Sequence, residues 1–119
     1  PLGQELRKRG AKNRLGFFLH IPWPPRRLLA ILPEAQALVR SLFAYDVIGF
    51  HTDEWLSSFR DYCTAELGAT VDGDELVLDD RRVRVRRCAR ADRALQGLAA
   101  EGPDPALRAR LCDVPRRPR

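Results

Sequence analysis

The stretch GFFLHIPWPP, residues 16–25, decides the fold class of this chain. Its first half is continuously apolar rather than alternating, which is typical of a parallel strand buried on both faces. The three prolines that follow cannot continue a strand or enter a helix interior, because proline lacks a backbone N–H and restricts the residue before it. We therefore expect His20 where a buried strand gives way to a stiff loop.

Helical patterns surround this strand and a second short apolar run, DVIGFH at residues 46–51. Residues 4–10 predict the end of a helix with Gly10 at its C-cap, and residues 26–32 and 34–44 predict two more helices. Another helix is expected from Thr52 or Asp53 to about Leu67, ended by Gly68. The positions expected to face the core are Ala35, Leu38, Val39, Leu42 and Phe43 in residues 34–44, and Trp55, Leu56, Phe59, Tyr62 and Cys63 in the last helix.

This alternation of helices and strands predicts a βαβ arrangement and an open, mostly parallel sheet. Ligands of such sheets bind outside the carboxyl ends of the strands, and His20 and His51 both fall at those ends. The pattern weakens after Val71. Residues 75–78 and 82–85 form a hairpin around Asp79-Asp80, or neither segment is a strand.

Composition limits the kind of protein. The chain has 119 residues, one domain or a slice of one, and its 45% hydrophobic content is enough for a core. No apolar run approaches the roughly 18 residues of a membrane span, and the first residues do not resemble a secretory signal. The spacing of the three cysteines indicates neither a zinc site nor a disulfide framework, so we expect a cytoplasmic protein.

Charge divides the chain into two parts. Residues 1–80 carry 9 Lys/Arg and 12 Asp/Glu, whereas residues 81–119 carry 12 Arg and 4 acids. We assign residues 1–85 to a folded domain and residues 86–119 to an Arg-rich tail of doubtful fold. An Arg-rich tail could neutralise nucleic-acid phosphates. It has no interleaved aromatic residues and no recognition helix, so nucleic-acid binding is only an alternative.

The residues around this stretch carry a specific resemblance. ELRKRGAKNRLGFFLHIPWPP, then AILP, then AYDVIGFHT resemble the trehalose-6-phosphate synthase family over residues 1–85. The family's HIPFP has its phenylalanine replaced by Trp23. The resemblance implies a retaining glycosyltransferase with two Rossmann-like domains, of which this chain is a partial, doubly wound N-terminal one. It also implies transfer of glucose from UDP-glucose to glucose 6-phosphate without a metal or other cofactor.

The resemblance also assigns site residues. His20 matches the family's active-site histidine beside the donor sugar, whose backbone carbonyl faces the developing positive charge. Trp23 either contacts the substrate or plugs the core. Arg26 follows the loop closely enough to reach an anionic ligand, or it is a surface charge. We expect a structural or rim role for His51.

Several parts of the family pattern are missing. The HDYHL-like block that touches the acceptor and the second domain that holds the donor phosphates are not in this sequence. Arg86 to Asp92 replace an FPIGID-like link, which suggests a changed reading frame or a decayed gene. We therefore expect a fragment with no turnover of its own. A non-catalytic module that docks onto a complete synthase is a further alternative, and a homo-oligomer of the full-length enzyme stays open.

Overall fold

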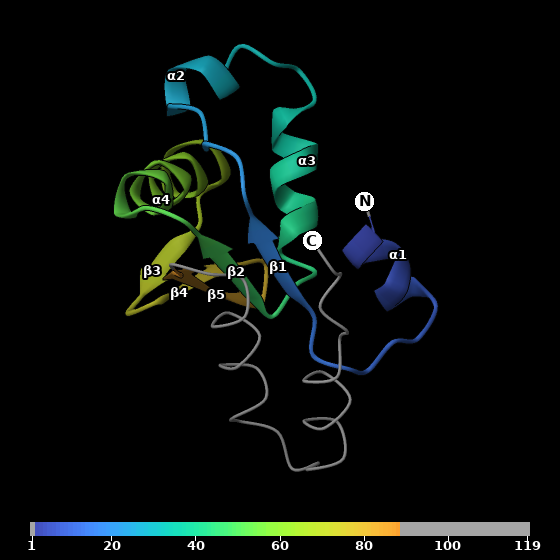
Figure 1. Ribbon diagram of the computed structural model, residues 1–119. Coiled ribbons are helices and arrows are strands. Elements are labelled where there is room, and N and C mark those ends of the chain that lie inside the picture. Colours follow the sequence, from blue (N-terminus) through green and yellow to red (C-terminus); the bar gives the residue numbers. More distant parts are fainter. Residues whose placement is uncertain (1, 89–119) are drawn as a thin grey trace, which may run out of the picture.

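The structure is a computed structural model, and it describes residues 2–88. They form a five-stranded sheet with the strand order β1-β2-β5-β4-β3, packed against helices (Figure 1). The helices are α1 (Leu2–Lys8), α2 (Arg26–Leu29), α3 (Ala35–Leu42) and α4 (Asp53–Leu67). The strands are β1 (Gly16–Leu19), β2 (Val47–Phe50), β3 (Thr70–Asp72), β4 (Glu75–Leu78) and β5 (Arg81–Arg87).

The sheet has a parallel part and an antiparallel part. β1 pairs with β2, and β2 with β5, in parallel register, with Leu19 opposite Phe50 and Phe50 opposite Arg87. β3, β4 and β5 form an antiparallel meander. The predicted hairpin is confirmed, because Asp79 and Asp80 both have positive φ and join β4 to β5 as a tight turn. β3 was not expected from the sequence. The Rossmann-like α/β class is confirmed.

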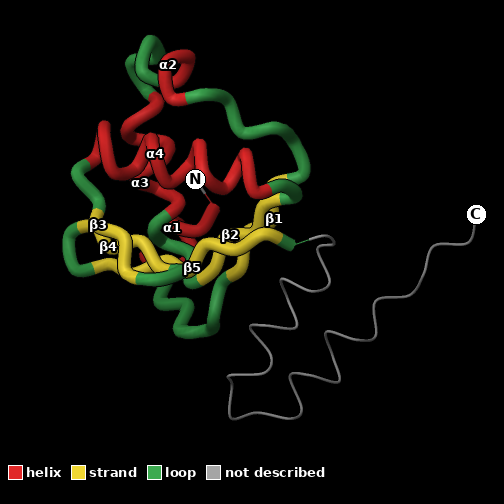
Figure 2. Tube along the Cα trace, turned by 90° about the vertical axis from the view of Figure 1, so that its left-hand side faces the viewer, coloured by secondary structure: helices red, strands yellow, loops and turns green. Residues whose placement is uncertain are grey.

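The helices α2, α3 and α4 lie on the same side of the sheet (Figure 2). This follows from the chain path: β1, β2 and β5 are added in one direction across the sheet, and right-handed crossovers then keep the connecting helices on one face. α4 contacts β2 and β5 directly, while α3 contacts α1 and α4. Within residues 2–88 the sheet is thus covered by helices on one side.

The prediction that the first strand is buried on both faces is wrong. β1 is an edge strand of the described sheet, Gly16 is exposed, and the other three residues are only partly buried. All four residues of β2 are buried instead. An edge strand lies at the margin of the layers that cover a sheet, whereas β2 lies in the middle, between β1 and β5.

The core lies between α4 and the sheet. Phe50 and Phe59 are fully buried with ring centroids 5.1 Å apart. The predicted caps of α4 are confirmed, because the Thr52 hydroxyl accepts a hydrogen bond from the Trp55 N–H at 3.2 Å and Gly68 adopts a left-handed conformation. The predicted inner face of α4 is also confirmed: Phe59, Tyr62 and Cys63 are buried, and Trp55 and Leu56 pack against the core.

One predicted core position of α3 is wrong. Ala35, Val39, Leu42 and Phe43 are buried, but the Leu38 side chain is 53% exposed. Leu38 lies at the margin of the narrow stripe that Ala35, Val39 and Leu42 form along the helix. The expected C-cap of α1 is confirmed, since Gly10 has φ +84° and its N–H donates to the Arg7 carbonyl.

β5 continues beyond the predicted domain boundary at residue 85. The strand runs to Arg87, and the Cys88 N–H donates to the Phe50 carbonyl at 2.7 Å. The tail predicted for residues 86–119 lies outside the described residues from residue 89 onward. Across residues 2–88, no helix has the length and apolar content to cross a membrane.

Candidate active site

The two histidines meet at the carboxyl ends of the parallel strands. His20 follows β1 and His51 follows β2, and these strands are paired in parallel. The imidazole centroids of the two histidines are 5.4 Å apart with an interplanar angle of 63°. The expectation that both lie at the ligand-binding edge of the sheet agrees with this geometry.

Two further aromatic side chains join the histidines. The Phe18 ring contacts both imidazoles edge-on, with centroid distances of 4.6 Å to His20 and 4.9 Å to His51. The Trp55 ring, from the first turn of α4, contacts His51 at 5.9 Å. We call Phe18, His20, His51 and Trp55 the ring cluster. Sequence reasoning placed Trp55 on the core side of α4 and gave no sign that it reaches His51.

His20 is exposed and makes few polar contacts. Within residues 2–88, its imidazole makes ring contacts with Phe18 and His51 and takes part in no hydrogen bond or ion pair. Its backbone carbonyl likewise accepts no hydrogen bond from the described residues. The next residue, Ile21, is 65% exposed. The end of β1 thus presents an imidazole and a carbonyl dipole to the surroundings of the sheet.

Trp23 anchors the loop that follows His20. Its side chain is 9% exposed and contacts Phe59 and Phe50 edge-on, at centroid distances of 4.9 Å and 6.3 Å. The indole Nε1 is buried and has no hydrogen-bond partner among the described residues. This packing matches the core-plug alternative of the sequence analysis. Substrate contact by Trp23 stays a prediction.

Arg26 lies on α2 and reaches toward α4. Its guanidinium is 3.4 Å from the Asp61 carboxylate and 3.6 Å from that of Glu66. The side chain is 41% exposed, so these ion pairs are of the weak surface type. Contact between Arg26 and an anionic ligand stays a prediction, and it would compete with the two carboxylates.

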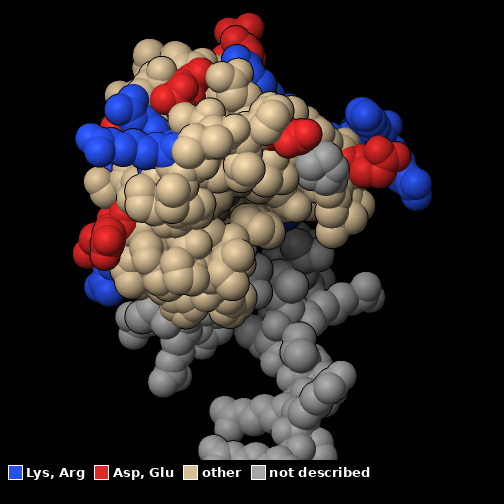
Figure 3. Space-filling model, turned by 90° about the horizontal axis from the view of Figure 1, so that it is seen from above, with Lys and Arg blue, Asp and Glu red and all other residues tan. Residues whose placement is uncertain are grey.

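The surface at this end of the molecule is largely uncharged. Figure 3 looks down on the side toward which β1 and β2 point in Figure 1, and most of the visible surface there is neither acidic nor basic. Exposed apolar side chains from the loop after His20 and from α2 and its surroundings contribute to the uncharged surface of the molecule: Ile21, Leu28, Ile31 and Leu32.

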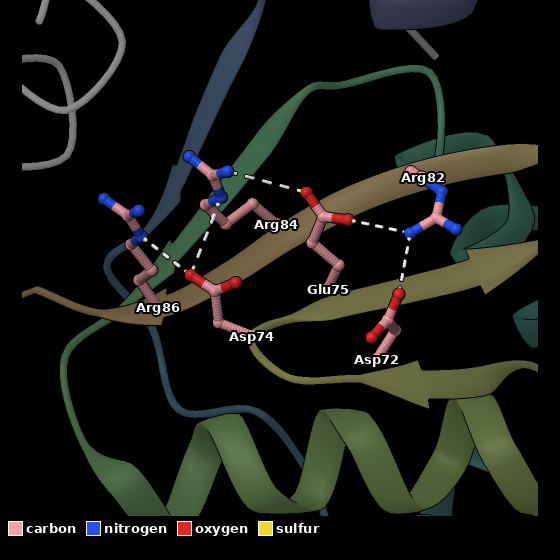
Figure 4. Close-up of polar contacts among 6 residues, drawn as sticks. All are labelled: Asp72, Asp74, Glu75, Arg82, Arg84 and Arg86. Atoms are coloured by element: carbon pink, nitrogen blue, oxygen red, sulfur yellow. Dashed lines mark hydrogen bonds and ion pairs between the residues drawn. The ribbon is translucent and has the colours of Figure 1, made fainter. Parts of the chain in front are cut away.

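Four of the five arginines of β5 pair with nearby carboxylates, three of which are drawn in Figure 4, and Arg81 donates to the Phe43 carbonyl instead. Arg82 bonds to Asp72 at 3.0 Å and to Glu75 at 3.1 Å. The remaining pairs join Arg84 to Asp74 and Glu75, Arg86 to Asp74, and Arg87 to Asp53. The period-two spacing of Arg82, Arg84 and Arg86 signals a shared strand face. Within the described residues, β5 is therefore no free basic stripe for nucleic acid.

The opposite end of the sheet is tied together by Arg7 and Asp46. Asp46 Oδ2 accepts hydrogen bonds from Arg7 Nη2 and from the Leu15 N–H, both at 2.7 Å. Arg7 also donates to the carbonyls of Ala44, Ala11 and Asn13. These bonds link residues up to 39 positions apart, which no local sequence pattern signals. A hollow of about 330 Å³ lies beside them, lined by Arg7, Phe43, Tyr45, Asp46, Asp80, Arg81 and Arg82.

The cysteines of the described residues are buried thiols. Cys63 is fully buried, and burial raises the pKa of its thiol to about 12. Burial also raises the pKa of Cys88, which the neighbouring Arg86 and Arg87 partly offset. Cys112 lies outside the described residues. Across residues 2–88, no group of three or more His, Cys, Asp or Glu side chains is arranged to hold a metal ion.

The described residues form a Rossmann-like α/β sheet with two histidines at the carboxyl ends of its parallel strands. A sequence profile of glycosyltransferase family 20 matches residues 1–89, and the chain belongs to this family. The resemblance to trehalose-6-phosphate synthases is thereby confirmed. The trehalose-6-phosphate synthase of Sinorhizobium fredii is 46% identical over 77 residues, which are 64% of this chain and 17% of the relative.

Solved structures agree with the sequence relatives. The crystal structure of an α,α-trehalose-phosphate synthase (UDP-forming) from Burkholderia xenovorans, in complex with glucose-6-phosphate, superposes with a TM-score of 0.70 and 38% identity. It matches 73% of this chain and 20% of the longer one. A trehalose-6-phosphate synthase studied with bisubstrate glycomimetics superposes with a TM-score of 0.71 and 33% identity over 75% of this chain and 20% of its own. The chain spans about a fifth of these relatives.

Proposed function

We propose that this chain is part of the N-terminal domain of a UDP-forming trehalose-6-phosphate synthase. The complete enzyme transfers glucose from UDP-glucose to glucose 6-phosphate with retention at the anomeric carbon, in the cytoplasm and without a metal ion. The names of the relatives support the nucleotide and the acceptor. The 119-residue chain contributes one wall of the donor-sugar site and has no turnover alone.

The observation that carries this proposal is the environment of His20. Its carbonyl lies at the carboxyl end of a parallel strand and accepts no hydrogen bond from the described residues. Glucosyl transfer builds positive charge on the anomeric carbon and ring oxygen of the donor, and a carbonyl oxygen aimed at that charge stabilises the transition state. Because Trp23 anchors the following loop in the core, this dipole needs little reorganisation during the reaction.

Other groups must supply the binding of the donor phosphates. Within the described residues, two cations near the carboxyl end of the sheet already have carboxylate partners: Arg26 pairs with Asp61 and Glu66, and Arg87 pairs with Asp53. A diphosphate needs cations or backbone N–H groups whose charge is not already neutralised. This is why we expect the isolated chain to be inactive.

The direct test replaces the matching segment of the Sinorhizobium fredii synthase with residues 2–88 of this chain. We expect the chimera to release UDP from UDP-glucose and glucose 6-phosphate, and the 119-residue chain to release none. A folded chimera without activity would contradict the proposed role. UDP release by the 119-residue chain would contradict the proposal that this chain has no turnover alone.

A second candidate function is a non-catalytic module that docks onto a complete synthase. It is favoured by the edge position of β1 and by the exposed apolar side chains Leu28, Ile31 and Leu32. Size-exclusion chromatography of the 119-residue chain mixed with the full-length Sinorhizobium fredii synthase tests it. Elution of a stable mixed complex would favour docking, and independent elution would exclude it for this partner.

A further inference from the structure

We propose that His51 is a positioning residue, which holds the His20 side chain in place at the end of β1. This inference rests on the proposed function for its catalytic consequence. Its structural content, the contact between the two imidazoles, can be tested without catalysis. His51 acts through His20 and is not assigned a contact with the substrate.

The His20 side chain has few restraints of its own. Within residues 2–88 its ring contacts Phe18 and His51 and forms no hydrogen bond or ion pair. Phe18 belongs to the same edge strand, two residues earlier, so it moves together with His20. Of the two contacts, the one to His51 is therefore the link between His20 and another part of the molecule.

His51 lies between a buried strand and a capped helix. It directly follows β2, whose four residues are all buried, and Phe50 is 0% exposed. It directly precedes Thr52, whose hydroxyl caps α4. A residue between a buried central strand and a capped helix has little backbone freedom.

Two further rings contact the His51 ring. Phe18 contacts it at a centroid distance of 4.9 Å and 79°, and Trp55 contacts it at 5.9 Å and 84°. Edge-to-face contacts at such distances favour one relative orientation of the rings. The contacts thus run from α4 through Trp55 and His51 to His20.

The catalytic consequence concerns the His20 carbonyl. A contact that holds the His20 ring also restrains the backbone at the end of β1, and transition-state stabilisation by a fixed dipole is sensitive to its position. A displacement of about 1 Å at a reacting group can cost a factor of about 100 in rate. If His51 acts by ring packing, then a flat apolar ring of similar size should replace it. His51→Phe should therefore keep the orientation of His20, and His51→Ala should lose it.

Nuclear magnetic resonance of the 119-residue chain tests the contact. We expect nuclear Overhauser effects between the ring protons of His20 and those of His51, and retained effects between His20 and the introduced phenyl ring in the His51→Phe variant. In His51→Ala we expect the His20 ring-proton shifts to move toward random-coil values, while the amide spectrum of the core stays unchanged. An unchanged His20 ring in His51→Ala would overturn the proposal.

Kinetics of the chimera with the Sinorhizobium fredii synthase test the consequence. We expect His51→Ala to lower kcat between about 10- and 100-fold with little change in KM, and His51→Phe to restore kcat to within about threefold. Val71→Ala, an exposed position on β3, is the matched control and should leave both constants unchanged. Equal kcat in His51→Ala and the parent would overturn the proposal. If the parent chimera and all its variants release no UDP, the proposed function is contradicted instead. The resonance experiment still tests the contact between the two imidazoles.

Discussion

The two ends of the parallel strands use their polar groups in opposite ways. At the amino end, Asp46 accepts hydrogen bonds from the Arg7 guanidinium and the Leu15 N–H, both at 2.7 Å. At the carboxyl end, within residues 2–88, the His20 ring contacts Phe18 and His51 but forms no hydrogen bond or ion pair, and its carbonyl accepts no hydrogen bond. Polar groups that are already hydrogen-bonded within the fold are not available to bind a ligand. The comparison therefore indicates that the carboxyl end is the functional one.

The carboxyl end contains its own structural anchor, three residues after His20. Trp23→Ala should lower the free energy of unfolding by about 3–5 kcal/mol, because it leaves a cavity beside Phe50 and Phe59. Trp23→Phe should cost about 1–2 kcal/mol, since it keeps most of the volume and removes a buried N–H without a partner among the described residues. Denaturant unfolding of the 119-residue chain measures both. A loss below about 0.5 kcal/mol for Trp23→Ala would show that Trp23 is not a core residue.

The amino end should be the more sensitive one to loss of a polar group. Asp46→Ala should lower the free energy of unfolding by about 1–2 kcal/mol, because it removes two charge-assisted hydrogen bonds from a half-exposed carboxylate. Asp61→Ala is the matched control: its pair with Arg26 is longer and more exposed, and its loss should cost less than about 0.5 kcal/mol. If the two substitutions lower the free energy of unfolding equally, Asp46 contributes no more to stability than an ordinary surface carboxylate.

Between the two ends, the core should respond to alkaline pH. Burial raises the pKa of Cys63 from 9.0 to about 12, so the unfolded chain loses this proton first as pH rises. Stability from this thiol is complete below pH 9 and is lost as pH rises toward 12, by up to about 1.4 kcal/mol per pH unit. Burial also raises the pKa of Tyr62 and acts in the same direction. Between pH 8 and pH 10, the free energy of unfolding should fall less in Cys63→Ala than in the parent. An equal fall in both would contradict the assignment of this pH dependence to Cys63.

The ion pairs of β5 should have the smallest effect. Raising NaCl from low to about 0.5 M should lower the free energy of unfolding by less than about 1 kcal/mol, because Arg82, Arg84 and Arg86 pair with partly exposed carboxylates. Arg82→Gln should reduce this salt dependence. A rise in stability with NaCl would instead indicate that repulsion among the arginines outweighs their ion pairs.

The sequence predicted the features that depend on nearby residues or on chain order. The caps of α4 at Thr52 and Gly68 were predicted because capping chemistry is local. His20 and His51 were expected at one edge because parallel strands place their carboxyl ends together. The exposure of β1 was missed, because a continuous apolar run shows what a strand can pack against and not which neighbours it has.

Contacts between distant residues were beyond the sequence patterns. The bond between Arg7 and Asp46 joins residues 39 positions apart, and Arg7 alone looked like an ordinary cation in the last turn of a helix. The contact between Trp55 and His51 was missed for a different reason. Trp55 fitted the apolar stripe of α4, and the helical period cannot show that its ring lies at the end of the stripe beside β2.

The most direct test of the account compares His20→Ala with Asp46→Ala in the chimera that carries residues 2–88 in the Sinorhizobium fredii synthase. His20→Ala keeps the carbonyl but removes the ring contacts that restrain it, so we predict that it lowers kcat for UDP release by about 10- to 100-fold and leaves the unfolding temperature nearly unchanged. We predict that Asp46→Ala lowers the unfolding temperature and leaves kcat per folded enzyme unchanged. The reverse pattern, or loss of kcat in both variants alike, would contradict the assignment of function to the carboxyl end of the sheet.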